Sequence, residues 1–142
     1  MPLHLMKLAV GVVDLDHLKV VQAARRRERK QPARSPHWIF TRNCPKRTAD
    51  VLAGGSLYWV VKGVMRCRQE VVGFEVDNDA DGRRYCRIKL RRTIVRTAPK
   101  AMNAFQGWRY LAPESAPPDV SAGDSADLPE EMAADLRRLG LL

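Results

Sequence analysis

Residues 54–63 constrain the fold of this chain more than any other stretch. They read Gly-Gly-Ser-Leu-Tyr-Trp-Val-Val-Lys-Gly, so aromatic and β-branched side chains are bounded by glycines at both ends. Such side chains favour a buried strand, and glycine supplies the backbone freedom that tight turns require. The stretch predicts a buried strand over residues 56–63. It also predicts that at least one of Gly54 and Gly55 has a positive φ angle.

The rest of the chain predicts a mixed α+β domain. Asp14 or Asp16 can cap a helix, because apolar residues follow at helical spacing at positions 15, 18, 21 and 24. A shorter helix is expected from Pro45 to Leu52, and residues 98–104 are expected to form a connector. Further strands are expected over residues 3–10, 37–42, 64–76, 83–93 and 105–111.

A change of apolar phase within residues 64–76 indicates how the sheet is shaped. Met65 and Cys67 form one alternating set, whereas Val72, Phe74 and Val76 form the opposite set. A bulge or bend between residues 67 and 72 would explain this change, and bulges curve sheets. The expected fold is therefore a bent, mostly antiparallel, barrel-like sheet of five or six strands with two or three helices.

Charge divides the chain into a basic body and an acidic tail. Residues 1–112 carry 23 Lys and Arg against 9 Asp and Glu, and residues 113–142 carry 2 against 7. We interpret residues 1–112 as a basic α+β domain, 113–128 as an acidic linker rich in Pro and Ser, and 129–142 as a short amphipathic helix. This pattern is typical of nucleic-acid binders, although solvated charge on a basic protein gives the same composition.

Neither a membrane segment nor a metal site is expected. The longest apolar run, residues 8–13, is far shorter than the roughly 20 residues of a spanning helix, and the N-terminus does not resemble a signal peptide. A cytoplasmic protein is expected. Cys44, Cys67 and Cys86 match no zinc-ligand spacing and contain no C-x-x-C motif, which favours reduced, buried thiols and no metal or other cofactor.

No catalytic residue can be assigned from motifs. A P-loop, a G-x-G-x-x-G segment and a nucleophile elbow are all missing from the sequence. An enzyme acting on a nucleotide or nucleic acid remains an alternative, and it would need a carboxylate such as Glu70 or Glu75 in a pocket beside Lys or Arg. A protein-interaction or assembly factor is a further alternative.

The leading interpretation is an RNA- or DNA-binding protein, with RNA as the first choice. Cations flank the central strand, and aromatic side chains accompany them, as single-stranded nucleic acid requires. Arg25 to Lys30 form a basic run at a helix end, either a solvated face or a set of phosphate contacts. Trp59 and Trp108 fit either the core or a stacking role, with Arg109 beside Trp108. The expected phosphate contacts are Arg42, Lys46, Arg47, Lys62, Arg66 and Arg68.

Several of these segments resemble a bacterial family of unknown function that is familiar from alphaproteobacteria. The matching segments, within residues 3 to about 120, are Pro45-Lys46-Arg47, residues 54–63, Arg68-Gln69 and Phe105-Gln106-Gly107-Trp108-Arg109-Tyr110-Leu111. That family implies no activity and no catalytic residues. The layout of elements is also similar to the PUA, ASCH and EVE superfamily, whose small mixed barrels commonly bind RNA or modified bases. Gly55-Ser56 here replaces the Gly-Asp that usually precedes their third strand.

Overall fold

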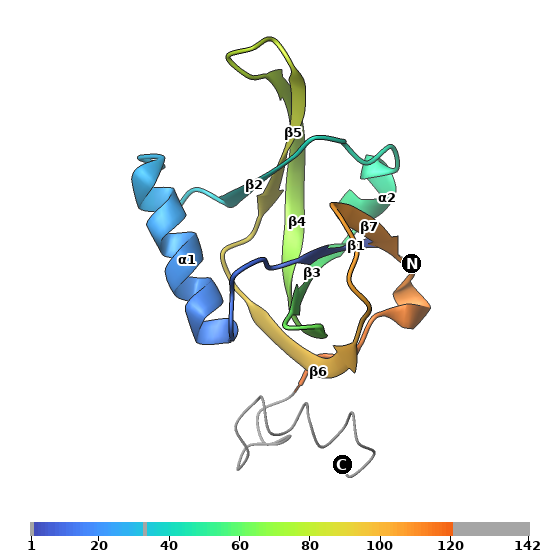
Figure 1. Cartoon of the computed structure of the whole chain (residues 1–142). Coiled ribbons are helices and arrows are strands. Elements are labelled where there is room, and N and C mark those ends of the chain that lie inside the picture. The colour runs from blue at the N-terminus through green and yellow to red at the C-terminus, as the bar shows by residue number, and fades with distance from the viewer. Residues whose placement is uncertain (1, 33, 121–142) are drawn as a thin grey trace.

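The computed structural model describes residues 2–32 and 34–120 (Figure 1). The expected helix over residues 129–142 and the expected linker beyond residue 120 lie outside the described residues. The helices are α1 (Leu15–Glu28), α2 (Thr48–Leu52) and a 3₁₀ turn, η1 (Pro113–Ser115). The strands are β1 (His4–Leu8), β2 (His37–Thr41), β3 (Ser56–Val61), β4 (Val64–Asn78), β5 (Arg84–Leu90), β6 (Val95–Ala101) and β7 (Trp108–Leu111).

The strands form one seven-stranded mixed sheet. Its order is β2-β5-β4-β3-β1-β7, and β6 pairs with β4 off this path. The β1–β3 pair is parallel, and the other pairs between the described strands are antiparallel. The long crossover between β1 and β3 contains α1, β2 and α2, as a parallel connection requires. Figure 1 shows α1 on one side of the sheet and α2 near β7.

The expected α1 begins where the sequence places it. The side chain of Asp14 accepts a hydrogen bond of 2.7 Å from the backbone N–H of His17, so Asp14 is the N-cap. Leu15 and Leu18 are buried on the face that meets the sheet. The helix is thus confirmed, and Asp14 is the cap of the two candidates, Asp14 and Asp16, that the sequence offers.

Two register shifts bend β4. One lies between Val71 and Gly73 opposite β5, at the end of the predicted interval. The other places Arg66 as an extra residue, because Val60 pairs with Met65 while its neighbour Trp59 pairs with Cys67. This second bulge corrects the sequence interpretation: Met65 and Cys67 do not share a face, and they enter different core clusters.

The sheet is not the closed or barrel-like form that the sequence predicts. β2 and β7 end the strand order and do not pair with each other within the described residues, and the sheet does not curl strongly. The bulges bend β4 locally, but closure needs the two edges to meet. The extra strand, β6, replaces much of the expected connector. The sequence does not predict β6 because proline is unfavourable within a strand. Pro99 lies where the β4–β6 register is irregular.

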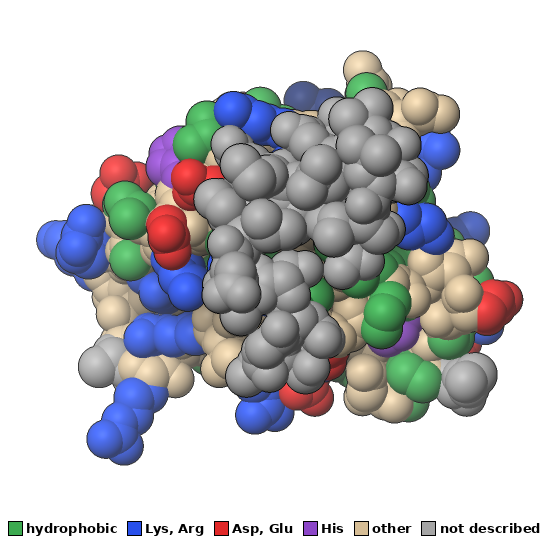
Figure 2. Space-filling view, turned by 90° about the horizontal axis from the view of Figure 1, so that it is seen from below, with side chains coloured by type: hydrophobic (Ala, Val, Ile, Leu, Met, Phe, Trp, Pro, Cys, Tyr) green, Lys and Arg blue, Asp and Glu red, His purple; other side chains and the backbone are tan. Residues whose placement is uncertain are grey.

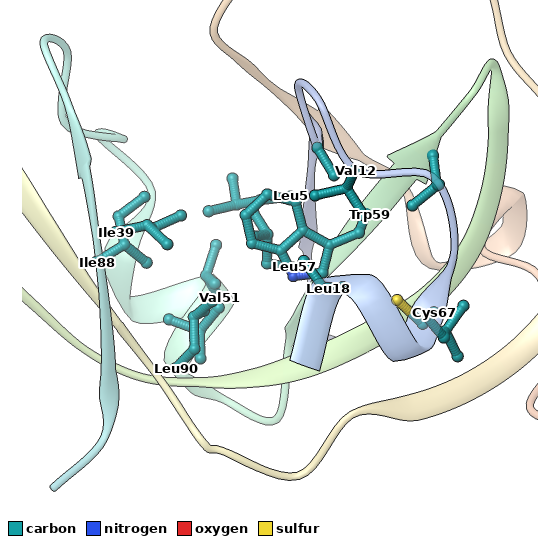
Figure 3. Close-up of a cluster of buried hydrophobic side chains, with 14 of the residues drawn as sticks. Leu5, Val12, Leu18, Ile39, Val51, Leu57, Trp59, Cys67, Ile88 and Leu90 are labelled. Atoms are coloured by element: carbon teal, nitrogen blue, oxygen red, sulfur yellow. The ribbon is translucent and has the colours of Figure 1, made fainter. Parts of the chain in front are cut away.

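The central strand β3 is buried on both faces, as its apolar run predicts. Leu57, Trp59 and Val61 enter a large cluster that also contains Leu18 of α1 and Val51 of α2 (Figure 3). The opposite face of the sheet has a smaller cluster, which contains Tyr58, Val60, Met65, Phe105 and Leu111. In the described part of the chain, no helix combines the length and hydropathy that crossing a membrane would require.

The turn before β3 needs both of its glycines. Gly54 has φ +106°, which confirms the predicted left-handed conformation. At Gly55 the constraint is space, because a Cβ atom there would lie 2.2 Å from the Leu3 carbonyl oxygen and 2.6 Å from the Val51 carbonyl oxygen. The turn thus brings the start of β3 against β1 and α2.

Candidate nucleic-acid interface

A hollow of about 260 Å³ lies between α1 and the sheet, and we call it the α1 hollow. Its walls come from β1 and the loop after it, from α1, from β2 and from Trp59 of β3. The apolar part of the lining includes Leu18, Val21 and Ile39. The cationic part consists of Lys7, Arg25 and Arg29.

A second hollow, of about 330 Å³, adjoins the first, and we call it the Trp108 hollow. The two hollows share Lys7 and Phe40 in their walls. We call them together the basic groove. The remaining lining of the Trp108 hollow consists of Thr41, Arg42, Asn43, Gln106, Gly107 and Trp108.

The basic groove concentrates positive charge. None of the described residues that line it is Asp or Glu. Four cations line it: Lys7, Arg25, Arg29 and Arg42. Arg42 also contacts Asp79 at 3.2 Å, but this pair is exposed and solvent screens it. On the face shown in Figure 2, by contrast, Lys and Arg lie in separate groups with acidic side chains between some of them. A concave surface lined by one sign of charge focuses the field on an anionic ligand.

Lys7 lies at the centre of the groove because of its place in the sheet. It pairs with Trp59 across the parallel ladder and with Trp108 across the antiparallel ladder. Cross-strand partners present their side chains on the same face, so a Trp–Lys–Trp row runs across β3, β1 and β7. Burial, and next the charge of Arg25, lower the pKa of Lys7.

Arg29, at the end of α1, and Phe40 of β2 lie against each other in the wall of the α1 hollow. The Nη1 of Arg29 donates a hydrogen bond of 2.6 Å to the Trp38 carbonyl, and its guanidinium lies 4.6 Å from the centroid of the Phe40 ring. Burial, and next the charge of Arg25, lower the pKa of Arg29. Phe40 remains 41% exposed, so part of its ring is open to a ligand. An exposed aromatic ring beside Arg is a suitable platform for a nucleobase.

His37 lines the α1 hollow, and its lowered pKa reflects the positive charge around it. Its side chain is buried, and its Nδ1 lies 3.2 Å from Nη1 of Arg26. A guanidinium can only donate, so Nδ1 is the acceptor and the neutral ring carries its proton on Nε2. Burial is the largest cause that lowers the pKa of His37 to about 3, followed by the charges of Arg26, Arg29, Arg25 and Arg92. The field that excludes a proton here favours an anion.

A buried network of amides attaches α1 to the sheet. Gln22 of α1 and Gln69 of β4 exchange hydrogen bonds of 2.7 and 3.0 Å. The same Oε1 of Gln69 accepts a bond of 2.7 Å from the indole N–H of Trp59, and its Nε2 donates to the Arg91 carbonyl. Because α1 is held at Gln22, Arg25 and Arg29 on its next turns are held over the groove.

The structure brings three of the sequence-predicted residues to the groove. Arg42 and Trp108 line the Trp108 hollow, and the indole N–H of Trp108 donates to the Asn43 carbonyl at 2.8 Å. Trp59 lines the α1 hollow, but it is only 5% exposed and belongs to the core, so it offers little surface for stacking.

The remaining predicted residues lie outside the linings of the groove. Arg66 is 3% exposed and donates to the Val61 carbonyl, which corrects its expected place at the surface. Arg68 forms a paired contact with both carboxylate oxygens of Asp119, at 2.8 and 2.7 Å. Lys62 lies exposed in the β3–β4 turn, and Lys46 is exposed in the loop before α2. Arg47 pairs with Asp50, and Arg109 lies over the Phe105 ring.

Lys7 and Phe40 are not among the residues that the sequence predicts to bind. Arg25 and Arg29 enter the sequence interpretation only as members of a basic run, with a solvated face as the alternative. Their four-residue spacing, which places two cations on one side of a helix, is the available signal for them. Lys7 carries no local signal, because the pairing of β1 with β3 and β7 joins segments far apart in the sequence.

The two carboxylates that the sequence suggests for an enzyme, Glu70 and Glu75, form ion pairs outside the basic groove. Glu70 contacts Arg91 at 3.0 Å, and Glu75 contacts Arg87 and Lys89 at 3.1 and 3.0 Å. Neither lines the basic groove. Over residues 2–32 and 34–120, no group of three or more His, Cys, Asp and Glu is placed to hold a metal ion.

Comparison with known proteins gives a family but no activity. The model of the family described as "Protein of unknown function (DUF1489)" matches residues 5–142, nearly the whole chain. This confirms the resemblance to a family of unknown function. Neither the curated proteins nor the solved structures contain a significant match.

Proposed function

Since the chain belongs to the DUF1489 family, whose function is unknown, we propose a function from its geometry: it binds single-stranded nucleic acid, RNA before DNA, in the basic groove. We place this activity in the cytoplasm. Lys7, Arg25, Arg29 and Arg42 contact phosphates, and the rings of Phe40 and Trp108 accept bases. No catalytic step belongs to this proposal.

The observation that carries the proposal is the composition of the groove. Cations line it together with the exposed ring of Phe40 and the partly buried ring of Trp108, and the described lining contains no carboxylate. Phosphates gain from the cations because each contact releases condensed counterions. Bases gain from the rings because every base has a face that can stack, which makes such binding tolerant of sequence.

A finer part of the proposal concerns architecture. The helix α1 beside the sheet, the mixed strand order and the bent β4 support a relationship to PUA-like domains. The open sheet differs from the small barrels typical of that superfamily. An experimental structure with bound RNA tests the proposed binding surface, because binding in the basic groove places the RNA against α1 and β2.

The experiment that tests the function is fluorescence anisotropy with a labelled single-stranded RNA. We expect the full chain to bind it and the affinity to fall steeply with salt, with a slope of log K against log salt of about −3 if four phosphates are neutralised on a single strand. Single-stranded DNA of the same sequence and duplex RNA serve as comparisons. Absence of binding at low salt, or binding unaffected by salt, would contradict the proposal.

A further inference from the structure

Two thiols from different parts of the chain meet beside the groove. Cys44 lies in the loop between β2 and α2, and Cys86 lies on β5. Thr41 at the end of β2 pairs with Cys86, so the loop that follows turns back over this position. The two Sγ atoms are 2.7 Å apart. That separation is only slightly longer than a covalent S–S bond of about 2.05 Å, so little movement separates contact from bond.

The two thiols differ in access. Cys44 is partly exposed, whereas Cys86 is fully buried. Burial, and next the hydrogen bond with Cys44, raise the pKa of Cys86 to about 12. An external reagent therefore reaches Cys44 first, and Cys86 is positioned to react second, as a resolving thiol does. The third thiol, Cys67, is buried in the core on β4.

We propose that Cys44 and Cys86 form a reversible, redox-sensitive disulfide when the protein meets a small disulfide oxidant such as oxidised glutathione. The Cys44 thiolate attacks the oxidant, forms a mixed disulfide and releases one glutathione thiol. Cys86 then attacks the Cys44 sulfur, the bond between Cys44 and glutathione breaks, and the departing glutathione thiolate takes up the proton that Cys86 gives up. Two protein thiols are oxidised and one small disulfide is reduced, so electrons and protons balance. In a reducing compartment such a pair responds to oxidants and is not a permanent structural disulfide.

The bond would fix one wall of the basic groove. Arg42 and Asn43, directly before Cys44, line the Trp108 hollow, and the Asn43 carbonyl accepts the indole N–H of Trp108. After Cys44, the backbone N–H groups of Lys46 and Arg47 donate to the Tyr110 hydroxyl at 3.0 and 3.2 Å. Oxidation therefore attaches to β5 a loop that already contacts β7. This inference does not depend on the proposed function, because bond formation is measured without nucleic acid.

Peptide mapping of the full chain tests the pair. The protein is equilibrated in a series of glutathione redox buffers, its free thiols are alkylated, and it is digested with trypsin without reduction. The sequence places Cys44 in the peptide of residues 43–46, Cys86 in that of residues 85–87 and Cys67 in that of residues 67–68. We expect oxidation to link the first two peptides within one chain, reduction by dithiothreitol to separate them, and Cys67 to stay unlinked.

Two variants give the order of the steps. Cys86→Ser should accumulate glutathione on Cys44, and Cys44→Ser should leave Cys86 unmodified because it is buried. Oxidation should raise the melting temperature of the wild-type protein by at least about 3 °C and leave that of Cys44→Ser unchanged. A stable mixed disulfide on wild-type Cys44, a link that includes Cys67, or a bond between two chains would overturn the proposal. If a variant fails to fold, the wild-type peptide map alone decides.

Discussion

His37 shows how strongly a single residue feels the charge of this molecule. It is buried, it accepts a hydrogen bond from Arg26, and four arginines lower its pKa together with burial. Its pKa of about 3 in the folded protein lies below the ordinary value of 6.5. The unfolded chain therefore binds a proton that the folded protein excludes, and stability falls as pH drops through this window.

This linkage predicts a pH dependence that one substitution reduces. Between about pH 6.5 and 4.5, the term from His37 should cost the wild-type protein about 2–3 kcal/mol of unfolding free energy. His37→Gln removes this titration and can keep an acceptor for Arg26, so its stability should change less over the same interval. Thermal or urea unfolding at several pH values measures the difference.

The interval is chosen so that other groups do not obscure the result. Burial, and next Arg68, also lower the pKa of His4, but His4 is present in both proteins and cancels in the comparison. Neighbouring donors and cations lower the pKa values of Glu75, Asp79 and Asp119, so these carboxylates titrate mainly below the interval. Parallel pH profiles for the wild-type protein and His37→Gln would show that His37 is not held neutral.

Residues such as Lys7 also mark the limit of sequence interpretation. The tryptophans are recognisable in the sequence, since aromatic residues in strands stand out. That Lys7 lies between Trp59 and Trp108 depends on the register of two long-range strand pairs, which no local pattern contains. From the sequence, Trp59 itself fits either the core or a ligand contact, and its hydrogen bond to Gln69 places it in the core.

At the scale of the elements, the attachment of α1 to the sheet decides where the groove lies. Gln22, Gln69 and Trp59 satisfy one another in the core, where an unsatisfied polar group is costly. Gln69→Leu should lower the unfolding free energy by about 2–4 kcal/mol, because the Trp59 N–H, the Gln22 amide and the Arg91 carbonyl would all lose a partner.

A double-mutant cycle separates the network from simple loss of packing. Gln22→Leu removes the same amide pair from the side of α1, so the combined variant should lose clearly less stability than the sum of the two single variants. Urea unfolding of the four proteins gives this coupling. Strictly additive losses would mean that the two glutamines stabilise the protein independently.

The elements also show which parts of the fold a sequence can predict. The helix α1 is predictable because its cap and apolar spacing are local, and β3 because its apolar run is continuous. The extra strand β6 escapes prediction because Pro99 argues against a strand. The bulge at Arg66 escapes it because its two neighbours, Met65 and Cys67, are both apolar and can be buried on either face.

At the scale of the whole molecule, the net charge and the position of the charges make different predictions about how the protein binds nucleic acid. The chain is strongly basic, with a formal charge of +9, so weak binding to any polyanion is expected from composition alone. Binding in the basic groove is a narrower claim, because it assigns the affinity to one surface. The two explanations differ in what happens when equal charges are removed from different places.

Arg25 and Arg27 provide that comparison within one helix. Both are exposed cations of α1, but Arg25 lines the α1 hollow and Arg27 does not. Replacing either by Gln removes one charge and leaves the helix with a residue that suits it. Circular dichroism and melting temperature confirm that both variants keep the fold.

The most direct measurement is therefore the affinity of wild-type protein, Arg25→Gln and Arg27→Gln for the same single-stranded RNA, by anisotropy over a salt series. Binding in the basic groove predicts that Arg25→Gln raises the Kd about five- to tenfold and makes the slope of log K against log salt shallower by about 0.7, the contribution of one phosphate. Arg27→Gln should change the Kd less than about twofold. Equal losses in the two variants, or no loss in Arg25→Gln, would contradict binding in the groove.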